Sequence, residues 1–111
     1  MTDSNASKQI ATLNDAFRTT FNGGTLVLTA GIQALPEETQ VGILHAVRTF
    51  KTFTPDNDPH QEHDFGAVEY QGQRIFFKID YYDLELNCHS ENPADPNVTQ
   101  RVLTVMLANE Y

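Results

Sequence analysis

The sequence predicts an α+β domain with helices packed on one face of a small, mainly antiparallel sheet, in the order α-β-α-β-β-(β)-α. Two patterns predict it. Apolar residues recur every three or four positions in three segments, and they alternate with polar residues in a hairpin. The 111 residues suffice for a single domain, residues 1–111, of which residues 1–8 could be a disordered tail.

The first predicted helix carries an apolar stripe formed by Ile10, Leu13, Phe17 and Phe21. It should end at residues 22–24, Asn-Gly-Gly, because glycine takes the left-handed conformation that closes a helix. Residues 25–29, Thr-Leu-Val-Leu-Thr, are short and rich in β-branched side chains, which predicts a buried strand. A turn at residues 30–31 follows.

The second predicted helix opens at Pro36, since proline fits the first helical turn and the two glutamates after it face the positive end of the dipole. Its buried stripe is expected to be Val41, Leu44, Val47 and Phe50. Arg48 and Lys51 suit its C-terminal end.

A β-hairpin is predicted next, from residues 67–71 and 73–83, turning near Gly72. Its core face should be Ile75, Phe77, Ile79 and Tyr81. Residues 84–86 could extend the sheet, and residues 87–94 should form a polar loop. Asp95 followed by Pro96 resembles a helix cap, so a last helix is expected, with its apolar positions at Val98, Val102, Val105 or Met106, and Ala108.

The charge is divided unequally along the chain. Fifteen acids and seven bases give a net charge of −8. Up to Thr52 four acids and four bases cancel, whereas from Phe53 eleven acids face three bases. The excess of acids in the second half argues against direct binding of nucleic acid, because such binding needs lysine and arginine to release counterions. It suits a cation or a basic protein surface, although plain solubility explains the charge equally well.

Other features of the sequence bear on its cellular location. No apolar run approaches the ~20 residues that cross a bilayer, and the N-terminus has no signal-peptide pattern. The single cysteine, Cys88, cannot form an internal disulfide, which fits a reducing compartment. A cytoplasmic protein is therefore expected.

The most polar segment is residues 56–66, where acids and histidines are dense and bases are lacking. Its candidate binding residues are Asp56, Asp58, His60, Glu62, His63 and Asp64. Imidazole and carboxylate suit a divalent metal such as zinc or manganese, so His60, His63, Asp58 and Asp64 are candidate ligands. A network of caps and Asx turns is the alternative, and it explains the same residues without a ligand.

A second group of polar residues lies on the hairpin strand. Lys78, Asp80 and Tyr82 fall on the face opposite the predicted core, and Asp83 follows them. With Glu62, Lys78 and Asp80 are candidates for acid–base catalysis, although a cross-strand ion pair is the commoner role. Cys88 beside His89 suggests a thiol nucleophile, but no orienting third group accompanies it.

Four blocks of the sequence resemble a known family. They are residues 28–32 (LTAGI), 56–66 (DNDPHQEHDFG), 78–83 (KIDYYD) and 101–108 (RVLTVMLA). Through them the chain resembles, over roughly residues 13–111, a family of small bacterial proteins classed as a domain of unknown function. The resemblance implies a bacterial cytosolic protein, and a mobile-element setting favours a defence or counter-defence role.

Two functions from different classes follow from these observations. The first is a small acidic protein that regulates or inhibits a macromolecular partner, through a basic protein surface or a nucleic-acid-handling complex. Its sharpest form is an anti-CRISPR or antirestriction inhibitor. The alternative is a metal-dependent hydrolase that uses the loop with His60, Glu62, His63 and Asp64. The oligomeric state is left open between a monomer and a homodimer, the latter through Tyr81, Tyr82 and neighbouring aromatics.

Overall fold

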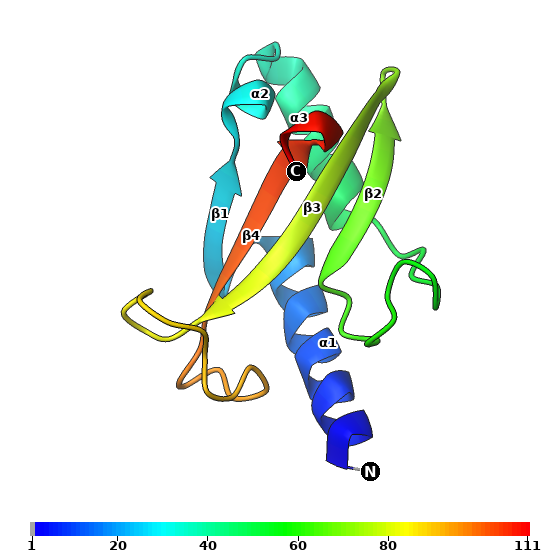
Figure 1. Cartoon of the computed structure of the whole chain (residues 1–111). Coiled ribbons are helices and arrows are strands. Elements are labelled where there is room, and N and C mark those ends of the chain that lie inside the picture. Colours follow the sequence, from blue (N-terminus) through cyan, green and yellow to red (C-terminus); the bar gives the residue numbers. More distant parts are fainter. Residues whose placement is uncertain (1) are drawn as a thin grey trace.

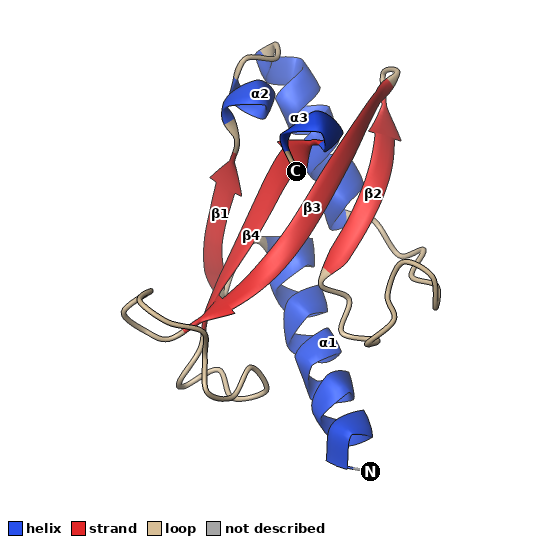
Figure 2. Cartoon of the chain, in the orientation of Figure 1, coloured by secondary structure: helices blue, strands red, loops and turns tan. Residues whose placement is uncertain are grey.

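Two long helices cover one face of a four-stranded sheet in the computed structural model, which describes residues 2–111 (Figures 1 and 2). The strands are β1 (Gly24–Leu28), β2 (Phe65–Tyr70), β3 (Gln73–Tyr82) and β4 (Gln100–Leu107). The helices are α1 (Thr2–Thr20), α2 (Ala30–Gln33) and α3 (Glu37–Arg48), with a final 3-10 turn, η1 (Ala108–Glu110). Residues 2–8, considered above as a tail, form the start of α1.

The sheet has the strand order β1-β4-β3-β2. β2 pairs with β3 and β3 with β4 in antiparallel fashion, whereas β1 runs parallel to β4. The predicted α+β class is confirmed, as is a mainly antiparallel sheet with helices on one face. Along the sequence, α2 and α3 connect β1 to the β2–β3 hairpin, and β4 then enters the sheet between β1 and β3. β4 runs antiparallel to β3 and therefore in the same direction as β1.

Three expectations about individual elements are wrong. Residues 100–107 form the central strand β4 where a helix was expected, because both neighbouring strands are available to pair with them. Residues 84–86 form an exposed turn and do not extend the sheet. Residues 30–33 make a full helical turn, α2, where a simple turn was expected.

The core lies between the sheet and the helices. The predicted core face of β3 is confirmed, with Ile75 and Phe77 fully buried. The predicted stripe on α3 is confirmed for Val47, which is fully buried, and for Leu44 and Phe50, which pack against the core. It is wrong at Val41, which is 63% exposed, and it missed Ile43, which is 1% exposed. Among the residues packed around them are Ile10, Phe17, Ile32, Val47, Leu103 and Val105.

The end of α1 differs from the glycine closure that the sequence predicts. Phe21 takes the left-handed conformation, with φ 62°, and its backbone N–H donates to the Phe17 carbonyl. Gly23 also has a positive φ, of 106°, and it redirects the chain into β1.

The opposite face of the sheet carries no long helix. The C-terminal turn η1 crosses its end, so the rest of the face is open (Figure 1). In the part of the chain that the structure describes, no helix is both long and apolar enough to span a membrane.

Candidate functional site

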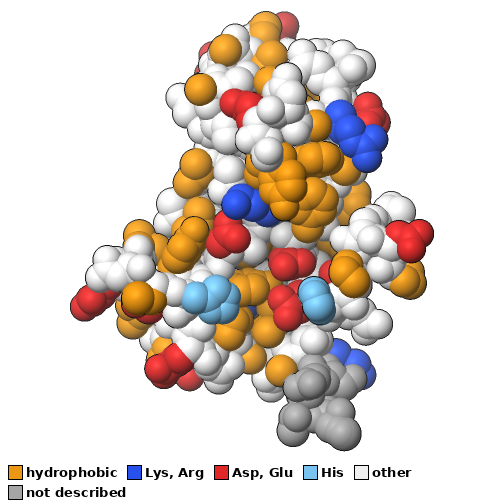
Figure 3. All heavy atoms as spheres, viewed as in Figure 1, with side chains coloured by type: hydrophobic (Ala, Val, Ile, Leu, Met, Phe, Trp, Pro, Cys, Tyr) orange, Lys and Arg blue, Asp and Glu red, His pale blue; other side chains and the backbone are white. Residues whose placement is uncertain are grey.

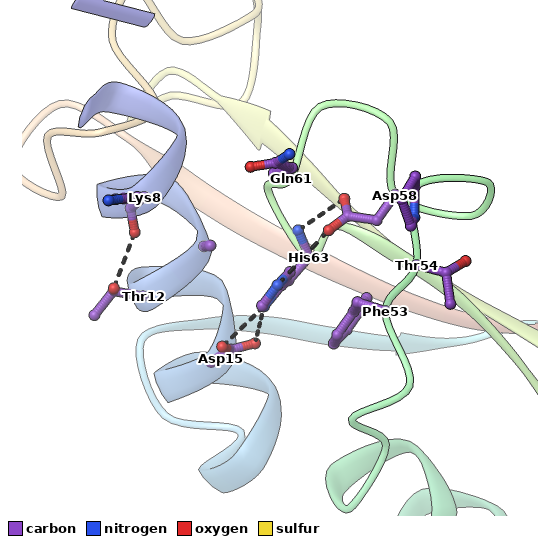
Figure 4. A pocket seen from close by; sticks show the side chains of 10 residues that line it. Lys8, Thr12, Asp15, Phe53, Thr54, Asp58, Gln61 and His63 are labelled. Carbon is purple, nitrogen blue, oxygen red and sulfur yellow. Dashed lines mark hydrogen bonds and ion pairs between the residues drawn. The ribbon is translucent and has the colours of Figure 1, made fainter. Parts of the chain in front are cut away.

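The polar loop between α3 and β2 is joined to α1 by a chain of acidic and basic side chains (Figure 4). The His63 Nδ1 atom lies 3.0 Å from each carboxylate oxygen of Asp15. The other ring nitrogen, Nε2, lies 3.6 Å from Asp58 Oδ2. Asp15 in turn accepts a hydrogen bond from Arg18 Nη2 at 2.9 Å. These contacts therefore run from α1 into the loop, in the order Arg18, Asp15, His63 and Asp58.

Asp58 organises the loop from within. It is 4% exposed, and its Oδ1 accepts the backbone N–H groups of Glu62 and His63, both at 3.1 Å. Gln61 and His63 have positive φ angles of 60° and 58°, the backbone geometry of tight turns. The Asp58 carboxylate thus supplies acceptors for the N–H groups of this sharply turned backbone. This is the role in a network of caps and turns that the sequence offered as the alternative to a metal site.

The ring of His63 is held on its face as well as at its edges. It stacks on Phe53 with 4.1 Å between ring centroids and 2° between planes. Both ring nitrogens lie against carboxylates, so neither is free to bind a metal or to accept a substrate proton without breaking this arrangement. His63 is therefore placed as an anchor of the loop.

Arg18 joins the same network to the end of α3. Its side chain is 3% exposed, and Nη1 donates to the carbonyls of Val47, Arg48 and Phe50. The last carbonyls of a helix lack partners within the helix, and a guanidinium satisfies them while favouring the negative end of the dipole. Arg18 therefore fixes α3 and the following loop relative to α1.

A second, deeper network also joins α1 to the loop. Asn14 is fully buried, and its Nδ2 donates to Tyr81 Oη at 2.8 Å and to the Glu62 carbonyl at 2.9 Å. Its Oδ1 accepts from Arg101 Nε at 2.8 Å. The Tyr81 hydroxyl donates to Glu62 Oε1 at 2.9 Å. Asn14 and Tyr81 thereby bridge a buried cation and a carboxylate from different parts of the chain.

Burial acts on the titrating groups of this second network. It raises the pKa of Tyr81 far above its usual range, so the hydroxyl stays protonated and remains a donor. Burial also lowers the pKa of Arg101. The Arg101 guanidinium reaches the Pro93 carbonyl as well, which ties the loop after β3 to the same network.

A cavity of about 500 Å³ lies between α1 and this loop. Its polar lining includes Lys8, Asp15, Asp58, Gln61 and His63, and Phe53 forms part of its wall (Figure 4). Its acidic side chains belong to the anchoring network, because Asp15 and Asp58 each contact His63.

The structure separates most of the predicted metal ligands. His60 is exposed, and Asp64 lines a different cavity, beside Tyr82 and His89. Asp56, a candidate binding residue, lines a hollow beside Phe65 and Phe76. Only His63 and Asp58 come together. Within residues 2–111 no three His, Cys, Asp or Glu side chains are grouped so that they could hold a metal ion.

Asp64 lies beside β3, where its carbonyl accepts the backbone N–H of Ile79, and Asp80 lies on β3 itself. With Tyr82 and His89 they line a cavity of about 320 Å³. Burial raises the pKa of Asp64 above its ordinary 3.8, and the nearby negative charges of Glu62 and Asp58 raise it further. Burial and the neighbouring negative charges therefore disfavour the charged form of Asp64.

The remaining candidates have local partners. Lys78 pairs with Asp80 at 3.2 Å, and the two side chains are equally exposed. Both residues belong to β3, so the ion pair lies within one strand, whereas a cross-strand pair was expected. Asp83 accepts the backbone N–H of Asn87 and shapes the turn after β3. Cys88 is exposed, and His89 Nδ1 lies against the Ser90 carbonyl.

Sequence reasoning missed the α1 half of both networks, namely Asn14, Asp15 and Arg18, together with Arg101. A signal was present: Asn14 and Arg18 fall in line with Ile10 and Phe17 at helical spacing. Polar residues inside an apolar stripe are buried with it, and buried polar groups need partners.

Comparison with known proteins places the chain in a family. Residues 28–110 match the model of a family described as "Protein of unknown function (DUF3768)", and the chain belongs to that family. No curated protein and no solved structure gave a match. The matched segment contains Glu62, His63 and Tyr81, whereas their partners on α1 precede it.

Proposed function

We propose that this chain is a small acidic binding protein that regulates or inhibits a macromolecular partner through a basic surface of that partner. The observation that carries the proposal is an acidic end of the molecule, formed by residues 53–64 and 79–99. These two segments contain nine acidic residues and no lysine or arginine. They flank the end of β3 (Figure 1). Asp64 and Asp80 line one cavity there.

The internal networks use only part of this negative charge. Asp58 is compensated by backbone N–H groups and His63, and Glu62 is bonded by Tyr81. Glu85 and Glu91 are exposed and form no salt bridge within the described residues. A basic partner surface would balance these charges, and opposite charge would speed the encounter.

An acidic surface of this kind would compete with the phosphates of a nucleic acid for the same basic residues of the partner. The sharper form of the proposal is therefore an inhibitor that occupies the nucleic-acid channel of a CRISPR or restriction nuclease. Such a role accords with the bacterial mobile-element setting that the sequence resemblance implies.

The experiment is a quantitative pull-down from bacterial lysate at about 50 mM and about 500 mM salt, where screening lengths differ severalfold. Capture should occur at low salt, fall at high salt, and be reversed by added duplex DNA. The variant Glu85→Gln with Glu91→Gln should lose most of the capture. Glu37→Gln with Glu38→Gln, on α3, changes the net charge equally and should retain it. No captured protein at either salt, or equal loss in both variants, would refute the proposal.

The alternative of a metal-dependent hydrolase has less support from the geometry. Its ligands would have to include His63, whose two nitrogens lie against Asp15 and Asp58. We expect the melting temperature to be unchanged by EDTA and by added zinc or manganese, since a ligand shifts it only if it binds the folded state. Stoichiometric metal in tag-free protein would instead favour the hydrolase.

A further inference from the structure

The open face of the sheet carries an aromatic cluster. Phe65 and Phe76 lie 5.2 Å apart between ring centroids, and Tyr111 packs against both, at 5.8 Å and 5.7 Å. Tyr111 is 73% exposed. Hydrophobic side chains gather at the centre of this face, in the view that looks onto the open sheet (Figure 3). A patch of this kind on a sheet that lacks a covering layer marks an interaction surface.

The charges that the strands place on this face are balanced, unlike those of the rest of the chain. β2 and β3 place four charged side chains on it, and they form two ion pairs. Arg74 pairs with Glu69 at 3.2 Å, and Lys78 pairs with Asp80 at 3.2 Å. The strand register places only uncharged residues of β1 and β4 on the same side. In a chain with a net charge of −8 the strands therefore contribute no net charge to this face, and Glu110 of η1 adds one negative charge at the end that η1 crosses.

We propose that the open sheet face, centred on Phe65, Phe76 and Tyr111, is the surface through which two copies of this chain form a twofold dimer. Two copies, each with a net charge of −8, repel one another. They can therefore associate most readily through a surface on which positive and negative side chains are paired. A basic partner would be drawn to the acidic end, and a nucleic acid would require an excess of positive charge that this face lacks.

The ion pairs make the face complementary to itself. In a twofold contact the same patch lies on both sides, so Lys78 of one copy can approach Asp80 of the other. The aromatic cluster would supply the buried apolar centre, and the ion pairs would form the polar surround that such interfaces have.

Sedimentation equilibrium over a range of micromolar concentrations tests this with the purified full chain. Wild type should dimerise, and the dimer should tighten between about 50 mM and about 500 mM salt because screening reduces the repulsion between copies. Phe76→Glu should raise the dissociation constant at least about tenfold, as loss of a central aromatic anchor does. Val41→Glu changes an exposed apolar residue on α3 and should leave the dimer intact.

A charge exchange tests the same contact without touching the aromatics. Lys78→Asp places two acids side by side, and Asp80→Lys places two bases side by side, so each variant alone should be monomeric. Mixed together, they should form a heterodimer. This outcome would support the proposal even if Phe76→Glu failed to fold.

Three results would overturn it: a wild-type monomer at every concentration, a dimer unaffected by both sets of variants, or binding of single-stranded RNA to the aromatic face by the monomer. None depends on capture of a partner by the acidic end, because this experiment contains only the purified chain. Salt also separates the two proposals, since it should strengthen the dimer and weaken partner capture.

Discussion

The imidazole of His63 lies between the carboxylates of Asp15 and Asp58, with its Nδ1 atom 3.0 Å from both oxygens of Asp15. This contact joins the loop before β2 to a helix that is 48 residues away in the sequence. The loop that looks most like a reactive site in the sequence is thus a structural joint. We propose that its other acids, together with those of the loop after β3, form the surface that binds a partner.

The structural role of His63 predicts a loss of stability on substitution. His63→Ala should lower the free energy of unfolding by about 1–3 kcal/mol, because the bond to Asp15 and the stacking on Phe53 are lost together. Chemical denaturation followed by circular dichroism measures this. His60→Ala, in the same loop but exposed, should change stability by no more than about 0.5 kcal/mol. Equal effects of the two substitutions would contradict the anchoring role.

The buried network around Asn14 predicts a larger effect. Asn14→Ala removes the acceptor of Arg101 Nε, and Arg101 is only 3% exposed. A buried cation that loses its partner should cost about 3 kcal/mol. Asn97→Ala, on the exposed loop before β4, is the matched control and should be nearly neutral. A loss below about 1 kcal/mol for Asn14→Ala would show that Arg101 finds other partners.

Asp64 should destabilise the folded chain when it is ionised. Because its pKa is raised in the folded state, the unfolded chain releases this proton first, and stability falls as pH rises from 3.8 through the raised value. Asp64→Asn should therefore raise the melting temperature at pH 7, and the gain should shrink as pH falls towards 3.8. Thermal melts of both proteins across this range test the sign. A gain that is independent of pH would contradict it.

Glu110 should behave in the opposite way. Its carboxylate accepts from the Thr29 hydroxyl and from the backbone N–H groups of Leu107 and Gly31, and these bonds hold its pKa below the usual 4.5. Its contribution should be complete above pH 4.5 and be lost as pH falls through the lowered value.

Amide chemical shifts of Gly31 and Leu107 report this titration of Glu110. They should move together with an apparent pKa below 4.5. In Glu110→Gln that transition should disappear, and η1 should separate from the start of α2. A transition that persists in the variant would assign the titration to another group.

The sequence was sufficient for the elements whose apolar residues follow one clear period. In β3 the recurrence of Ile75, Phe77 and Ile79 at every second position predicted both the strand and its buried face. The pattern of apolar residues was misleading for β4. Val102 and Met106 lie on one side of this strand, and Leu103 and Val105 lie on the other. A central strand has apolar residues on both faces, and its period then resembles that of a helix.

The candidate site was predictable only in part, because the residues that contact the polar loop come from distant segments of the sequence. The sequence identified the acids and histidines of residues 56–64, but it could not show that Asp15 and Asn14 lie beside them. Asp95 illustrates the same limit. It resembled a helix cap, whereas its carboxylate accepts the N–H of Asn97 and closes a short turn before β4. Local patterns fix the residue types, and tertiary packing decides what they contact.

Hydrogen exchange of the chain with and without its captured partner tests the central proposal most directly. If the acidic end is the binding surface, amides in residues 53–64 and 79–99 should become protected while those of α3 keep their rates. Protection confined to α3, or no change in the two acidic segments, would contradict it.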